Sequence, residues 1–127
     1  MNSEYLGSYL NGLMNMASSN SKYIGPSFVE VDCFTKEEFK KYYKIEISPT
    51  TLNFEDMINE WFCDDKNVIE SIIYWTNNKI KDIKKVYIVD DKDYELFRKY
   101  NPFYSIDDIF ILETKKYLIT YVLGNNE

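Results

Sequence analysis

Three aspartates directly follow a short apolar run in the C-terminal half of the chain. The run VYIV at residues 86–89 is typical of a strand, and Asp90, Asp91 and Asp93 come at its end. Carboxylate oxygens are the ligands that Mg²⁺ prefers. The segment lacks the glycine of an EF-hand loop, however, and the chain has no G-x-x-x-x-G-K-[ST] motif. We therefore expect these aspartates to cap a following helix, with a metal site as the alternative.

Nucleophilic and zinc chemistry have little support in the sequence. The chain has two cysteines, Cys33 and Cys63, and no histidine to activate or accompany them. Asp64 and Asp65 follow Cys63 directly, and acidic neighbours are not the electropositive surroundings typical of a reactive cysteine. We expect no catalytic residue, no cofactor and no enzymatic activity. If a disulfide forms, it can only join the two cysteines to each other.

A binding surface is the stronger hypothesis, because one segment carries all of the net charge. Residues 45–78 hold seven acids and one base, whereas acids and bases balance on either side, so the formal charge of −6 is local. Within this segment, residues 54–62 have apolar side chains at helical spacing. The carboxylates beside this apolar stripe and just after it are Glu55, Asp56, Glu60, Asp64 and Asp65.

Two interpretations of these carboxylates remain open. Acids in the first turn suit the helix dipole, which accounts for Glu55 and Asp56. The others could cap the next helix or simply face solvent. Alternatively, the five form a surface that attracts a basic partner. Phe103 and Tyr104, which follow Pro102, are either core residues or interface anchors.

The elements that must position these residues follow from periodicity and capping signals. We expect helices at residues 5–14 (capped by Ser3), 36–43 (with a Thr35–Glu38 capping box), 54–62 (capped by Asn53), 67–80 and 93–100. We expect strands at residues 28–34, 86–89, 108–113 and 117–123, with a loop at 18–27, a break at 48–51 and a polar tail at 124–127. The prediction is one α+β domain, residues 1–127, with about four largely antiparallel strands and helices packed on the sheet.

Composition also limits the partners and the compartment. The only basic cluster is Lys79, Lys81, Lys84 and Lys85, and lysines suit the C-terminal end of a helix. We therefore expect no direct contact with nucleic acid. No apolar run approaches the roughly 18 residues of a membrane span, and the N-terminus has no basic segment before an apolar run. We expect a cytoplasmic protein that does not contact membranes.

The N-terminal part of the chain resembles a known family. The segment EYLGSYLNG at residues 4–12, a strand that reaches Asp32 and the segment FTKEEF at 34–39 are similar to the opening of ArdA-type antirestriction proteins. The matching positions are Tyr5, Gly7, Tyr9, Asp32 and Phe39, and the resemblance covers residues 4–42. It implies an elongated acidic DNA mimic from a mobile element. It also implies a strand at residues 5–11, where the periodicity predicts a helix.

Together these observations favour a small acidic inhibitor of a host nucleic-acid-processing complex, of anti-CRISPR or antirestriction type, from a phage or mobile element. The acidic face would occlude a basic nucleic-acid site of a nuclease or effector. An immunity protein that neutralises a partner toxin is the alternative, and an accessory domain of a mobile element is a third possibility. The oligomeric state stays open.

Overall fold

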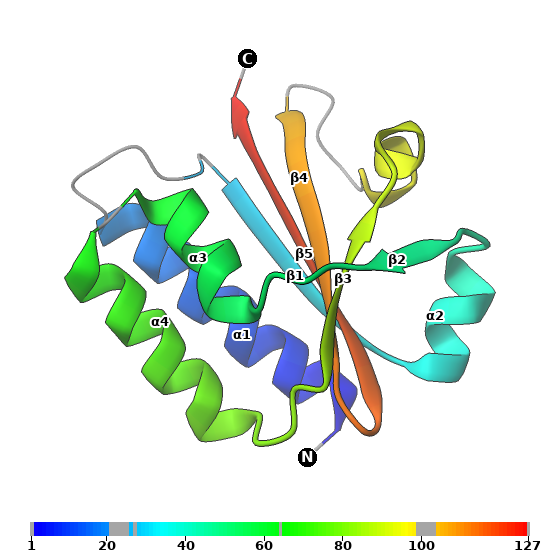
Figure 1. Cartoon of the computed structure of the whole chain (residues 1–127), viewed down its shortest axis with the longest axis horizontal. Coiled ribbons are helices and arrows are strands. Elements are labelled where there is room, and N and C mark those ends of the chain that lie inside the picture. The colour runs from blue at the N-terminus through cyan, green and yellow to red at the C-terminus, as the bar shows by residue number, and fades with distance from the viewer. Residues whose placement is uncertain (1, 21–25, 27, 64, 99–103, 127) are drawn as a thin grey trace.

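The computed structural model describes residues 2–20, 26, 28–63, 65–98 and 104–126. Helices and one five-stranded sheet make up most of this part of the chain, which confirms the expected α+β class (Figure 1). In chain order the elements are α1 (Ser3–Asn20), β1 (Phe28–Thr35), α2 (Lys36–Tyr42), β2 (Ile47–Pro49), α3 (Phe54–Phe62), α4 (Lys66–Lys79), β3 (Lys85–Val89), the 3-10 helix η1 (Asp91–Phe97), β4 (Tyr104–Glu113) and β5 (Tyr117–Asn126).

The sheet has the strand order β1-β5-β4-β3-β2, and every neighbouring pair is antiparallel. The fifth strand is β2, which lies where we expected a break. Its Ile47 pairs with Val89 and its Pro49 with Tyr87. Proline has no N–H group to donate to a strand ladder. It is tolerated here because β2 is an edge strand with one partner.

Two predicted ends of elements were wrong. The segment 124–127, expected as a polar tail, belongs to β5 as far as Asn126. The helix expected at 93–100 is instead the 3-10 helix η1, which begins at Asp91. Two predicted caps were more accurate: Thr35 and Glu38 form the expected capping box of α2, and Asn53 caps α3 as expected. The structure adds a reciprocal contact from Asp56 to Asn53.

Helix α1 is longer than the periodicity predicted and has a different cap. Asn2, not Ser3, accepts the exposed amide of Tyr5 through its side chain, at 2.8 Å. The helix continues through residues 18–20, which we expected in a loop. Residues 5–11 are therefore helical, and the strand implied by the family resemblance is absent from this segment.

A polar stripe of α1 covers the outer edge of strand β1. The Asn11 side chain accepts from the amide of Val31 at 2.8 Å, and the Asn15 side chain donates to the carbonyl of Val29 at 3.1 Å. One turn earlier, a Cβ on Gly7 would lie 3.2 Å from the Cys33 amide nitrogen, so the helix backbone approaches the strand closely here. Because these residues recur every fourth position, they share one helix face and satisfy an edge that would otherwise be open.

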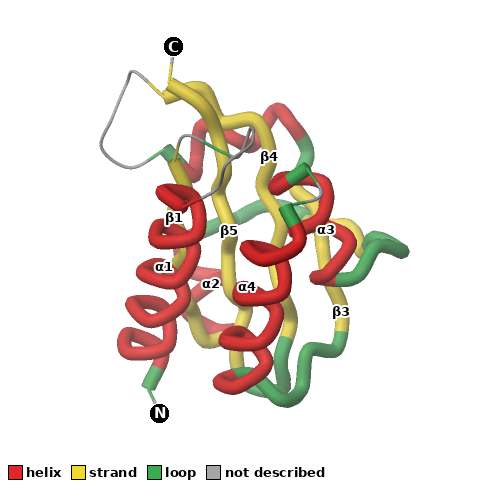
Figure 2. The backbone as a smooth tube through the Cα atoms, turned by 90° about the vertical axis from the view of Figure 1, so that its left-hand side faces the viewer, coloured by secondary structure: helices red, strands yellow, loops and turns green. Residues whose placement is uncertain are grey.

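Both faces of the sheet are covered. Helices α1, α3 and α4 pack on one face, whereas α2 and η1 lie on the other side (Figures 1 and 2). The first core is the larger, and its fully buried members include Leu10, Phe62 and Phe110. The second includes Phe39 and Phe97, which Tyr43 joins by stacking on Phe97 at 4.3 Å between ring centroids. Covering one face with α3 and α4 leaves the outer sides of these two helices exposed.

Candidate functional site

The acidic side of α3 lies on the surface, as its amphipathic pattern requires. Phe54, Met57, Ile58 and Phe62 are buried, whereas Glu55, Asp56 and Glu60 are exposed. Asp56 has a structural role, because its carboxylate accepts the amide of Asn53 at 2.9 Å in the capping box. Glu55 and Glu60 form no ion pair within the part of the chain that the structure describes.

Among the remaining predicted contact residues, one is described in full and does not belong to this surface. Asp65 is buried, with 7 % of its surface exposed, and occupies the N-cap position of α4, so including it in an exposed acidic face was wrong. Tyr104 begins β4, but its side chain is not described, and Asp64 and Phe103 lie outside the described residues. Asp65 therefore does not extend the acidic face beyond Glu60 as we expected.

The structure extends the acidic face across to the neighbouring helix instead. A groove of about 470 Å³ runs between α3 and α4, with Glu55 and Glu70 among its lining residues. Ile69 and Ile73 contribute apolar surface, and Tyr74, which is 64 % exposed, also lines the groove. Lys81, Asn77 and Asn78 complete the lining. The sequence contained the signal for Glu70, because it belongs to the acidic segment, but only the packing of α3 against α4 brings it near Glu55.

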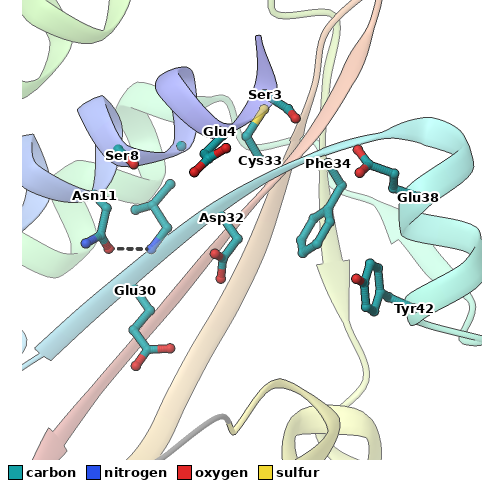
Figure 3. A pocket seen from close by; sticks show the side chains of 12 residues that line it. Ser3, Glu4, Ser8, Asn11, Glu30, Asp32, Cys33, Phe34, Glu38 and Tyr42 are labelled. Carbon is teal, nitrogen blue, oxygen red and sulfur yellow. Dashed lines mark hydrogen bonds between the residues drawn. The ribbon is translucent and has the colours of Figure 1, made fainter.

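A second acidic site lies at the outer edge of β1, between α1 and α2 (Figure 3). This cavity of about 490 Å³ is lined by four carboxylates and by no lysine or arginine among the described residues. The acids come from α1, β1 and α2, so no window of the sequence revealed them. They are Glu4, Glu30, Asp32 and Glu38. A cationic group would be the chemically matched ligand for such a cavity.

The fold itself uses part of this cavity's charge. Glu38 accepts the amide of Thr35 at 2.8 Å as part of the α2 capping box. Burial, together with Asp32 and Glu30, raises the pKa of the Tyr43 hydroxyl to about 12, which keeps this group protonated. Of the four carboxylates, Glu38 therefore has a structural role in the capping box.

Cys33, which also lines this cavity, is not an activated nucleophile. Burial, followed by the charges of Glu38 and Asp32, raises the pKa of its thiol to about 12. The thiolate is the reactive form, so Cys33 is almost entirely in its unreactive state near neutral pH. Cys63 is exposed at the end of α3, and both cysteines are free thiols.

One of the three aspartates after β3 caps the helix that follows. The Asp90 side chain accepts the amide of Lys92 at 3.1 Å, which confirms the expected capping role for this residue. Asp91 and Asp93 lie in the first turn of η1. Within the described residues, no group of three or more potential ligands is arranged to hold a metal ion.

Comparison with known proteins gives no family for this chain: no protein-family model, no curated protein and no solved structure matches it. Among the described residues, no helix has the length and apolar character needed to cross a bilayer. The surfaces of the chain are therefore the remaining source of information on its function.

Proposed function

We propose that this chain is a non-enzymatic, cytoplasmic binding protein that inhibits a nucleic-acid-processing complex. Its acidic α3–α4 side would occupy a basic nucleic-acid site on the partner, as an anti-CRISPR or antirestriction protein from a phage or mobile element would. One observation carries the proposal. Glu55, Glu60 and Glu70 are exposed on two packed helices, and none has an ion pair within the described part of the chain.

The α3–α4 groove gives these carboxylates a means of holding a basic side chain. Lysine and arginine place their aliphatic stems on apolar surface and keep the charged group at the rim. Here a stem would lie on Ile73 while its charge meets Glu55 or Glu70, and the exposed ring of Tyr74 offers a cation–π contact. Several such contacts would exclude the phosphates that the partner normally binds.

Charge reversal with a matched control tests the proposal. Glu55→Lys with Glu70→Lys reverses the groove, and Glu37→Lys with Glu46→Lys changes the net charge equally elsewhere. Glu55 and Glu37 are both exposed first-turn residues, of α3 and α2, so the two variants also lose similar helix-dipole energy. A third variant, Glu60→Lys, probes the outer side of α3.

Partners would be captured at low and high salt, identified and purified, and their affinities for each variant measured. We expect the groove variant to lose at least about tenfold in affinity, the control to stay within about twofold, and salt to weaken binding. We also expect nucleic acid to compete with the chain for the partner. A partner bound equally well by both variants, or one that nucleic acid never displaces, would contradict occlusion. If the partner is a toxin that nucleic acid never displaces from the chain, the chain is instead an immunity protein.

A further inference from the structure

Lysines from two distant segments meet at one end of the molecule. The connection between α4 and β3 lies beside the β4–β5 hairpin, near the start of α1, in both views (Figures 1 and 2). Two hydrogen bonds donated by backbone amides hold these two segments together. The Lys84 amide donates to the Glu113 carbonyl at 2.8 Å, and the Lys115 amide donates to the Asp82 carboxylate at 2.8 Å. We call this surface the lysine end, and it comprises Lys79, Lys84, Lys85, Lys115 and Lys116.

The two acids at the lysine end are already engaged. Asp82 holds the hairpin through the Lys115 amide. Glu113 pairs with the ammonium group of Lys36 at 3.2 Å and accepts from the Tyr87 hydroxyl at 3.3 Å. Two carboxylates against five lysines leave this end with an excess of positive charge, although the whole chain is acidic. Three of these lysines line a cavity of about 220 Å³. They are Lys79, Lys115 and Lys116, and Tyr117 is among the other lining residues.

Exposed aromatic rings continue this surface along α1 and α4. The Lys79 ammonium lies 5.7 Å from the ring centroid of Tyr5 and 5.0 Å from that of Tyr9. The Tyr9 hydroxyl donates to the Trp75 carbonyl at 3.4 Å, and Trp75 lies one helical turn before Lys79. Tyr5 is 52 % exposed and Trp75 44 %, so both rings have a face or edge open to solvent.

We propose that the lysine end, with Tyr5 and Trp75, binds single-stranded nucleic acid. Phosphates of the strand would contact the lysines, and unpaired bases would stack on the two aromatic rings, which is the combination typical of single-strand binding. A duplex would use the lysines alone, because its bases are already stacked. From the sequence we expected no contact with nucleic acid, because only the lysines at the end of α4 form a cluster along the chain. The hairpin lysines are added by the fold. This binding does not rest on the proposed function, because it uses other charged residues and no protein partner, although the Trp75 ring packs edge-on against Tyr74 of the groove at 5.0 Å between centroids.

The test uses the full chain alone with fluorescein-labelled single-stranded oligonucleotides, one of DNA and one of RNA, and a DNA duplex of equal length. Fluorescence anisotropy would be measured between about 50 and 200 mM salt. For four phosphate contacts, a slope of about −0.7 per contact predicts about a 50-fold loss of affinity over this range. The DNA and RNA arms distinguish the two sources of the strand.

Lys115→Glu with Lys116→Glu should lower the affinity at least about tenfold and reduce the salt slope by about 1.4. Lys40→Glu with Lys41→Glu, on the exposed surface of α2, makes the same charge change and should leave binding within about twofold. Trp75→Ala should weaken single-strand binding by about fivefold or more and leave duplex binding unchanged. If the hairpin variant fails to fold by circular dichroism, Lys84→Glu with Lys85→Glu replaces it.

Three results would overturn the proposal. The first is no binding of the wild-type chain at the lowest salt concentration. The second is an equal loss of affinity in the hairpin variant and the α2 control. The third is duplex binding as tight as single-strand binding, because that would show a charge effect without stacking.

Discussion

Removing the Asn11 side chain tests whether α1 protects the edge of the sheet. Asn11 accepts the amide of Val31 at 2.8 Å, and Val31 is buried, with 4 % of its surface exposed. Asn11→Ala leaves this part-buried amide without its side-chain partner. We expect the free energy of unfolding to fall, and we expect strand β1 to become a site for pairing with other chains.

The size of the effect follows from the contact. A net hydrogen bond contributes about 1 kcal/mol, and a buried amide left without a partner costs about 1–3 kcal/mol. Alanine recovers roughly 0.5 kcal/mol because it is a better helix former than asparagine. We therefore expect a net loss of about 0.5–2.5 kcal/mol. With an unfolding entropy of about 2.1 cal/mol/K per residue, a chain of 127 residues would melt about 2–9 °C lower.

Urea unfolding followed by circular dichroism would measure the loss, and amide hydrogen exchange at Val31 would locate it. Gly12→Ala is the matched control one position away. A Cβ on Gly12 meets no atom within 4 Å, so this change should stabilise α1 by about 1 kcal/mol. The reasoning is refuted if Asn11→Ala unfolds within about 0.5 kcal/mol of wild type and Val31 exchanges at an unchanged rate.

Two further predictions concern packing and pH. Gly124→Ala should destabilise the chain by about 3 kcal/mol or more, because its Cβ would lie 2.0 Å from the Ser105 carbonyl oxygen and 2.5 Å from a Phe28 ring carbon. A urea midpoint equal to that of Gly12→Ala would contradict this. Stability should also fall as the pH rises from about 9 to about 12, because in this range the unfolded state loses the Cys33 proton while the folded state, with a thiol pKa of about 12, keeps it. Cys33→Ala should show a shallower alkaline decline in urea midpoints, and an identical decline would contradict the assignment.

Local rules were sufficient for most of the elements. Thr35 and Asn53 were predicted as caps because capping depends on residues three positions apart, and the structure confirms both. Strand β2 was missed because a three-residue edge strand containing Pro49 has no periodicity of its own and exists only through its pairing with β3. The burial of Asp65 could not be predicted from local rules either, because burial at the start of α4 depends on how the helices pack.

The sequence by itself determined the class of the fold, the composition of each helix face and the sign of the charge in each segment. These properties depend on spacing within single elements. Only the tertiary structure decided which charges act together. Packing of α3 on α4 brings Glu70 to the groove beside Glu55, and a hydrogen bond of Asp82 places Lys115 beside the lysines that follow α4. Electrostatic interaction depends on distance in space and not on separation along the chain. Folding therefore gives this acidic chain both an acidic surface and a lysine end, although its net charge comes from one segment.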